Sequence, residues 1–308
     1  MNEVPARRTG MMDRDLAQFP GWQLGRAAQK QSIARRDLLG AMARAEGAPL
    51  GEPELDALTW ITQEWYEQGL PLDGRLSFTW YAMGRDLYGG GRSRWEPGGR
   101  IRELMRDAIA NLHAVVITLR SVNVLSGERA ATLRSKVHIL ETVVDHEQIQ
   151  LFRDGAGSSS EVGALRGETV EVTVAGWLVQ QLLEGPLVLD WATQRRLAGA
   201  AKRLWYELSA REGDFEPCVL GERSLMIELT DTFYGLMNLQ ASRERDNRVA
   251  LTSAAARVVK ADETYRAITI ERSGDGYVLR AIKRSPQALK TVASPAGQPA
   301  RQLAGVGR

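Results

Sequence analysis

The feature that most constrains the fold of this chain is a basic helical segment that leads directly into a pair of strands. The segment RERDNRVALTSAAARVVK, Arg243 to Lys260, has apolar residues at helical spacing that predict one buried face: Leu251, Ala254, Ala255 and Val258. The next segment, Tyr265 to Ser285, is predicted to form a β-hairpin. A helix followed by a hairpin ends a winged helix, an α+β unit that presents one helix to the DNA major groove.

The opposite face of this predicted helix combines small side chains with cations. It carries Val249, Thr252, Ser253, Ala256 and Lys260, with Arg245 and Arg257 at its edges. Small side chains let a helix approach base edges, and arginine can pair with guanine through two hydrogen bonds. Further candidates for phosphate contact are Arg243, Asn247 and Arg248 at the helix start and Arg272 and Arg280 on the hairpin. We interpret this surface as DNA-binding; the alternative is a solvated helix whose arginines only maintain solubility.

The same order of elements is predicted twice along the chain. The first set is a helix over 52–68, a strand over 75–78, a helix capped by Thr79, a helix over 100–113 and strands over 115–122 and 136–144. The second set is a helix over 193–212, a strand over 224–229, a helix capped by Thr230, the basic helix and the hairpin. This repeated order predicts an α+β fold of two tandem winged-helix domains.

The third helix of the first set is less suited to DNA. Its outward face offers Arg102 and Arg106, and Arg94 and Arg100 precede it, but Glu103 and Asp107 share that face. Carboxylates repel phosphate, so we expect backbone or protein contacts from the first domain and base reading from the second. Its inward residues are predicted to be Ile101, Leu104, Met105, Ala108 and Leu112.

We expect the following domain boundaries. Residues 1–51 form a partly disordered N-terminal arm with one amphipathic helix over 27–46, 52–153 the first winged helix, 154–168 a linker or mobile loop, 169–285 the second winged helix, and 286–308 a basic disordered tail. The second domain thus includes the strand VEVTV and the helix GWLVQQLLEG. The helix of the arm either packs on the first domain or is detachable and binds a partner protein or DNA.

Composition and missing motifs favour a cytoplasmic, non-catalytic protein. Cys218 is the only cysteine, and no uncharged run approaches the length of a membrane span. The glycine-rich stretch 89–99 lacks the GK[ST] ending of a phosphate-binding loop, and His113, His138 and His146 are scattered without metal-ligand spacing. We therefore expect no enzyme activity, no cofactor, no metal and no membrane contact.

The stretch from Val170 to Arg284 resembles the plasmid replication initiators of the replication initiator protein A type. The resemblance rests on the strand and helices of VEVTVAGWLVQQLLEGPLVLDWATQRRLAGAAKRLWYELSAR, including RLWYEL, and on SLMIELTDTFYGLMNL followed by the basic helix and hairpin. It implies binding of double-stranded DNA at repeated origin sites, help with strand opening, recruitment of host initiator and helicase, and a homodimer formed through the first domain. The sparse positive charge of the first domain's third helix departs from that pattern.

Two other functions fit the same fold. A winged-helix transcriptional regulator would bind one promoter site and need no helicase contact. A protein-interaction scaffold would bury its third helices against partners without binding DNA.

Overall fold

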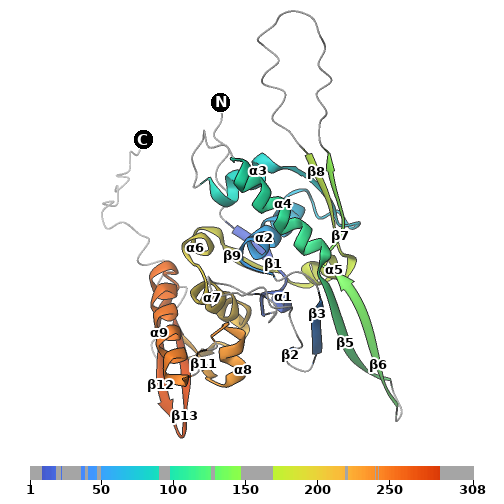
Figure 1. Cartoon of the computed structure of the whole chain (residues 1–308). Helices are drawn as coiled ribbons and strands as arrows, with labels where there is room; N and C mark the ends of the chain where they lie inside the picture. Colours follow the sequence, from blue (N-terminus) through green and yellow to red (C-terminus); the bar gives the residue numbers. More distant parts are fainter. Residues whose placement is uncertain are drawn as a thin grey trace, which may run out of the picture.

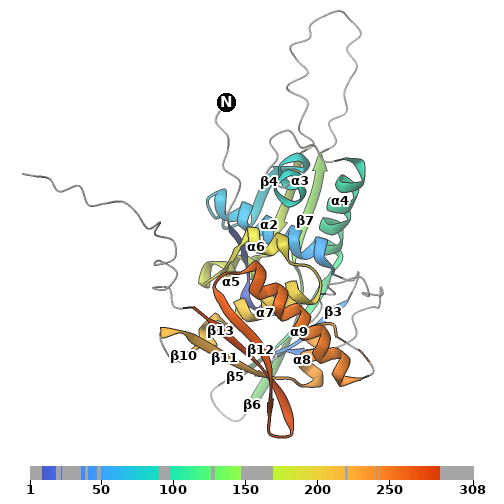
Figure 2. The same cartoon turned by 90° about the vertical axis from the view of Figure 1, so that its left-hand side faces the viewer.

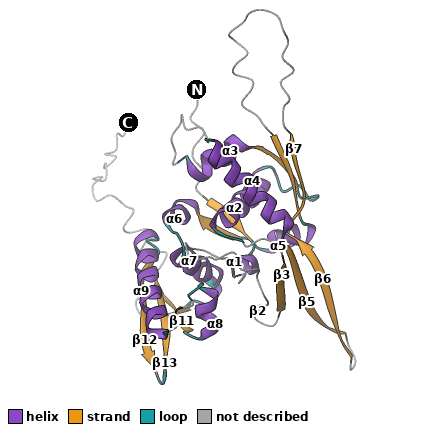
Figure 3. Cartoon of the chain, in the orientation of Figure 1, coloured by secondary structure: helices purple, strands orange, loops and turns teal. Residues whose placement is uncertain are grey.

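The computed structural model describes residues 9–18, 22, 36–38, 41–46, 50–89, 98–125, 129–146, 169–218, 221–239, 241 and 243–284. Helices and small antiparallel sheets make up this part of the chain, which confirms the predicted α+β class (Figures 1 and 3). Two units with the predicted order of elements can be recognised in it. Within the described residues, no helix combines the length and the apolar character needed to cross a membrane.

The first unit begins with α2 (Glu52–Glu67) and β4 (Arg75–Thr79) and continues with α3 (Trp80–Tyr88), α4 (Gly99–Ala114), β5 (Val116–Leu125) and β6 (Arg129–His138). As predicted, Thr79 is the N-cap of α3, because its Oγ1 accepts a hydrogen bond of 3.1 Å from the Ala82 backbone N–H. The return strand of the hairpin differs from the prediction over 136–144. It ends at His138, and the chain enters β7 (Leu140–His146), which belongs to another sheet.

The second unit repeats this order with α7 (Ala200–Ala210), β11 (Arg223–Glu228), α8 (Asp231–Leu236), α9 (Glu244–Ala261), β12 (Tyr265–Ser273) and β13 (Gly276–Lys283). Thr230 caps α8 as predicted, since its Oγ1 accepts a hydrogen bond of 3.2 Å from the Phe233 N–H. Strand β13 pairs with both β11 and β12, and the short β10 (Glu216–Pro217) completes this sheet. The hairpin turns at Gly274, whose φ of +59° suits glycine.

One strand lies in a different unit from the one predicted. β8 (Thr169–Val174), expected in the second domain, is the central strand of the sheet β4-β8-β7 in the first unit. Val172 is opposite Leu76 on β4 and Val143 on β7. The alternation of valines in VEVTV buries one face of the strand, and β4 and β7 supply backbone partners on both sides. Helix α5 (Gly176–Glu184) follows and buries Leu178.

The single helix predicted over 193–212 is in fact interrupted. α6 (Trp191–Arg196) is capped by Asp190, whose carboxylate accepts a 2.7 Å hydrogen bond from the Thr193 N–H. The chain then leaves helical geometry and passes through Gly199, whose φ is +59°, before α7 begins. The Gly199 N–H donates to the carboxylate of Glu52 at the start of α2. A short 3-10 turn, Glu212–Asp214, follows α7.

The described parts of the N-terminal region pack on the protein and do not form the predicted helix. β1 (Thr9–Met12) pairs with β9 (Leu187–Asp190), and α1 (Arg14–Gln18) follows β1. Within the range 27–46, the described residues form β2 (Arg36–Leu38) and β3 (Ala41–Glu46). β3 pairs with β5, the edge strand of the hairpin β5–β6. A strand at this place gives β5 backbone hydrogen-bond partners, which a helix would not provide. The predicted linker 154–168 and tail 286–308 lie outside the described residues.

The two units share a continuous core. Lys202 of α7 is buried, and its Nζ donates to the two carboxylate oxygens of Asp56 on α2 at 2.7 and 2.9 Å. The Thr59 and Tyr206 hydroxyls lie 3.0 Å apart across the same contact. Burial raises the pKa of the Tyr206 hydroxyl well above its usual range, and the nearby Asp56 carboxylate adds to this. The helices that begin the two units are therefore joined by buried polar contacts.

Candidate nucleic-acid interface

Helix α9 presents the predicted surface to solvent. Its apolar residues Leu251, Ala254, Ala255 and Val258 are buried. On the opposite face the following residues are exposed, and we call them the α9 stripe: Arg245, Val249, Thr252, Ser253, Ala256 and Lys260. Val249 lies near the middle of the stripe and is 62% exposed. The predicted division of the helix into a buried and an exposed face is confirmed, whereas DNA contact by the stripe stays a prediction.

Two residues at the start of α9 are engaged within the protein, although we predicted DNA contacts for both. Asn247 is buried, and its Oδ1 accepts a 2.9 Å hydrogen bond from the Ala241 N–H. Arg248 forms an ion pair with Glu244, with Nη1 and Oε1 2.6 Å apart. Its guanidinium carbon lies 3.9 Å from the centroid of the Tyr277 ring on β13. These contacts give both residues a role in positioning the helix start and the hairpin.

The other predicted residues of α9 remain at its surface. Arg243 precedes the helix and is exposed. The Thr252 hydroxyl donates to the Arg248 carbonyl at 2.8 Å, which uses its proton within the helix. Arg257 is exposed, and its Nη2 donates to the Ala198 carbonyl at 3.1 Å, on the connection between α6 and α7. One edge of the helix is thus tied to a neighbouring segment, while the α9 stripe is open.

The hairpin β12–β13 projects past one end of the second unit (Figure 1). Arg272 is exposed close to its turn. Arg280 is partly exposed, and its Nη1 lies 4.0 Å from an oxygen of Glu271 on the paired strand. Arg272 is therefore the better placed of the two for phosphate contact, since Glu271 partly offsets the charge of Arg280.

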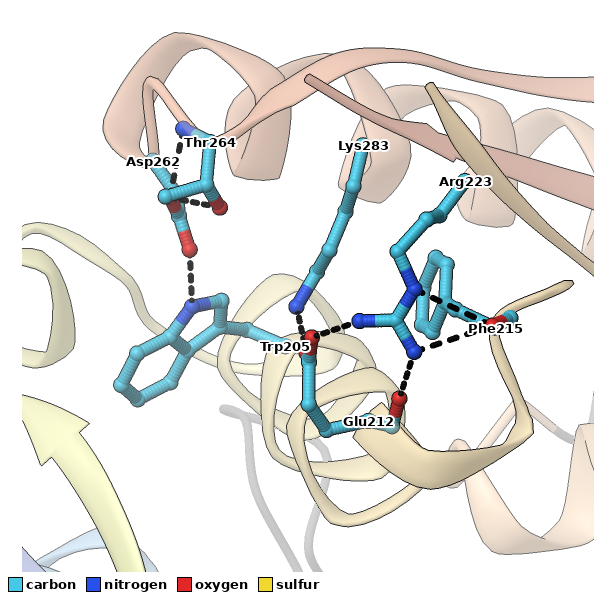
Figure 4. A network of polar contacts seen from close by, with 7 residues as sticks. All are labelled: Trp205, Glu212, Phe215, Arg223, Asp262, Thr264 and Lys283. Atoms are coloured by element: carbon cyan, nitrogen blue, oxygen red, sulfur yellow. Dashed lines mark hydrogen bonds and ion pairs between the residues drawn. The ribbon is translucent and has the colours of Figure 1, made fainter. Parts of the chain in front are cut away.

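A polar network fixes the base of the hairpin to the end of α7 (Figure 4). The Glu212 carboxylate accepts hydrogen bonds from Arg223 of β11, at 2.9 Å, and from Lys283 of β13. The Arg223 guanidinium also donates to the Phe215 carbonyl from Nε and Nη2, at 3.1 and 2.9 Å. The Lys283 ammonium lies 4.9 Å from the Phe215 ring centroid. The network holds two strands of the sheet against one turn.

A second group of contacts fixes the turn between α9 and β12. The Trp205 indole N–H of α7 donates to Asp262 Oδ2 at 2.8 Å, and the Thr264 N–H donates to Asp262 Oδ1 at 2.9 Å. Tyr265 follows, and burial raises the pKa of its hydroxyl well above the usual range, with Asp262 and Glu212 adding to the effect. The end of α9 and the hairpin are thereby held in one fixed relation. Sequence reasoning missed these residues because their partners are distant along the chain.

The corresponding helix of the first unit, α4, has a mixed outward face. Arg100 and Arg102 are exposed, together with Glu103 and Asp107. Leu104, predicted to face inward, is 38% exposed, because it lies at the edge of the apolar stripe formed by the buried residues Met105, Ala108 and Leu112.

Arg106 of α4 is held within the first unit. Its Nε lies 3.2 Å from Asp145 Oδ2, and its guanidinium carbon lies 5.7 Å from the Trp80 ring centroid. This ion pair reduces the charge that Arg106 offers to a ligand. Arg94, also predicted to contact DNA, lies outside the described residues.

Comparison with known proteins gives a likeness of fold. No protein-family model and no curated protein matches this sequence. A crystal structure of domains 2 and 3 of RctB aligns with a TM-score of 0.54 at 12% identity, over 88% of this chain and 98% of the RctB chain. A second crystal structure of the same domains gives a TM-score of 0.49 at 11% identity, over 91% and 99%. The likeness at a TM-score of 0.54 shows a shared mixed α+β arrangement of winged-helix type.

Proposed function

We propose that this protein is a replication initiator of a plasmid or secondary replicon, which binds repeated sites in origin DNA, assists strand opening and recruits host replication proteins. The observation that carries the proposal is the exposed α9 stripe beside a fixed hairpin. Arg245 and Lys260 lie towards its two ends, and the exposed carboxylate of Asp246 borders it only in the first turn of the helix. Such a surface fits a major groove, where small side chains allow close approach to the bases and arginine pairs with guanine.

The fold supports this proposal at a coarser level. It resembles the domains of the replication initiator RctB, and the likeness extends over both units. The sequence resemblance to replication initiator protein A points to the same class. Both are compatible with a role in which α9 reads bases and the hairpin contacts the flanking backbone through Arg272.

A selection from a library of random DNA duplexes tests DNA binding directly. We expect the full chain to enrich a shared sequence, with an affinity that falls steeply with added salt, at a log–log slope of about −0.9 per phosphate contact. Arg245→Ala with Lys260→Ala is expected to weaken the selected duplex about tenfold or more. The matched pair Arg100→Ala with Arg102→Ala on α4 is expected to change sequence preference little. Loss of preference in the α4 pair alone would reverse the assignment.

Replication is tested separately from DNA binding. The gene and its neighbouring DNA are placed on a plasmid that lacks an origin, and we expect the plasmid to be maintained and the neighbouring DNA to contain the selected sequence as repeats. Failure of maintenance with promoter repression intact would instead identify a transcriptional regulator. If the protein bound no duplex with an affinity that falls as salt is added, the interaction scaffold would be the remaining function.

A further inference from the structure

The short helix α6 is docked at the C-terminal end of α9. The Thr193 hydroxyl oxygen of α6 lies 3.4 Å from the carbonyl oxygen of Ala261, the last residue of α9. Just beyond α6, the Ala198 carbonyl accepts the 3.1 Å hydrogen bond from Arg257. Both views place α6 at the upper end of α9, between that helix and the first unit (Figures 1 and 2). The surface of α9 therefore continues onto α6.

This continuation carries cations that the internal contacts do not neutralise. Arg195 and Arg196 end α6 and are both exposed. Arg195 Nη1 donates to the backbone carbonyl of Asp86 at 3.0 Å, which holds the guanidinium in place, and among the residues that the structure describes no carboxylate pairs with it. Arg196 and Lys260 of α9 form no ion pair within the described residues. Two helices thus bring exposed cations to one edge of the second unit.

The carboxylates around α6 are used inside the protein. Asp190 accepts hydrogen bonds from both the N–H and the hydroxyl of Thr193, at 2.7 and 2.5 Å. Glu52 accepts from the Gly199 N–H. Asp86 Oδ2 accepts from the Trp60 indole at 3.1 Å. Glu263 is exposed, but it lies beyond the end of α9. The positive charge of the α6 end is therefore available to a ligand.

We propose that Arg195 and Arg196, together with Lys260, bind phosphates of the DNA backbone that borders the groove occupied by α9, on the side of the first unit. This inference rests on the proposed function, because it extends the contact with the same duplex beyond the α9 stripe. Arginine suits the task, since its planar guanidinium keeps its charge and donates in pairs to phosphate oxygens. A cation in the last turn also stabilises a helix through the helix dipole, so the test must measure more than stability.

The test uses the full chain and the duplex obtained by the selection described above. Binding is measured at several salt concentrations for the wild type, Arg196→Gln and the double variant Arg195→Gln/Arg196→Gln. We expect the log–log salt slope to fall in magnitude by about 0.9 for the single variant and about 1.8 for the double variant. Affinity should fall alike for the selected and a scrambled duplex, because phosphate contacts carry no sequence information.

Two controls separate phosphate contact from a structural role. Arg75→Gln removes a cation whose side chain is 80% exposed on β4 of the first unit, and it should leave the slope unchanged. Arg195→Lys/Arg196→Lys should restore most of the slope, because the charge is retained. The Arg196→Gln variant leaves the Arg195–Asp86 contact intact, so its thermal midpoint is expected to match the wild type within measurement error.

Neutral methylphosphonate linkages, introduced one at a time along the selected duplex, identify the phosphates concerned. The wild type should lose affinity at two or three positions outside the sequence that α9 reads, and the double variant should lose affinity only at the position that Lys260 contacts. A salt slope and a methylphosphonate profile equal to those of the wild type would overturn the inference while leaving the proposed function standing. A wild type that binds no duplex would overturn both.

Discussion

Helices α4 and α9 hold the same place in the two units, yet they present different surfaces. Each has an exposed apolar residue in sixth position, Leu104 and Val249 respectively. Around Leu104 the outward face includes Glu103 and Asp107, whereas Val249 is followed along its face by the small residues Thr252, Ser253 and Ala256. On α9 the acids are confined to the first turn, where Glu244 is paired with Arg248. The shared fold thus sets which face of each third helix is exposed, while the side chains on that face set its charge.

The sheets of the two units differ as well. In the second unit, β13 of the hairpin pairs directly with β11. In the first unit, β4 pairs with β8, a strand that comes after the hairpin in the chain. The first unit is therefore completed by residues that lead into the second. Two units joined in this way present different surfaces on their third helices.

The largest expected effect tests whether the units unfold as one body. Asp56→Ala leaves the buried Lys202 ammonium without its carboxylate, which should lower the free energy of unfolding by about 3 kcal/mol. Urea denaturation followed by tryptophan fluorescence should show one transition, displaced as a whole. Asp73→Ala, which breaks the exposed pair with Arg75, should cost less than about 0.5 kcal/mol. Two separate transitions, with only one displaced, would show that the units are independent.

The next effect concerns the surfaces of α4 and α9 directly. Val249→Glu adds a carboxylate to the middle of the α9 stripe and should weaken DNA binding roughly 30-fold, or about 2 kcal/mol. Leu104→Glu adds a carboxylate to α4 at the edge of its buried apolar stripe and should alter affinity less than about twofold. Fluorescence anisotropy with the selected duplex measures both. Equal losses would mean that the two helices contact DNA alike.

A smaller effect tests a feature that the units share. Thr79→Ala and Thr230→Ala each remove an N-cap hydrogen bond, to Ala82 and Phe233 respectively, and each should cost about 1 kcal/mol in the free energy of unfolding. The Thr→Ser variants keep the hydroxyl and should retain most of the stability. Thermal denaturation monitored by circular dichroism measures the stability of the Ala and Ser variants at each threonine. A cost at one threonine only would show that the caps are not equivalent.

The smallest effect concerns the residue that joins α9 to the hairpin. Arg248→Lys keeps a cation beside Glu244 but loses the planar guanidinium over Tyr277, and it should cost about 0.5 kcal/mol in stability. DNA affinity should change less than about threefold, because Arg248 is engaged within the protein. Urea denaturation and anisotropy on the same variant measure both quantities. A 30-fold loss of affinity with unchanged stability would place Arg248 at the DNA.

Features governed by local spacing could be predicted from the sequence. The caps at Thr79 and Thr230 and the buried face of α9 follow from neighbouring residues, and the structure confirms them. Asn247 could have been placed inside as well, since it lies one turn before the buried Leu251.

Features governed by pairing between distant segments were predicted wrongly or not at all. The sequence VEVTV predicts a strand but does not indicate which unit the strand joins. Pairing with β4 and β7 places it in the first unit. The break between α6 and α7 depends on Gly199 and on its contact with Glu52, far away in the sequence. The network around Glu212 joins residues from three separate elements. Spacing along the chain carries no record of such contacts.

The position of β8 also bears on how the chain folds as it leaves the ribosome. Strands β4 and β7 are synthesised first, and their facing edges find no partner until residues 169–174 have emerged. β1 likewise awaits β9, which ends at residue 190. Unpaired strand edges invite aggregation, so the nascent chain passes through a vulnerable interval. A chain cut after residue 153 would remain at that stage, and an isolated first half would be a poor starting point for dissecting the protein.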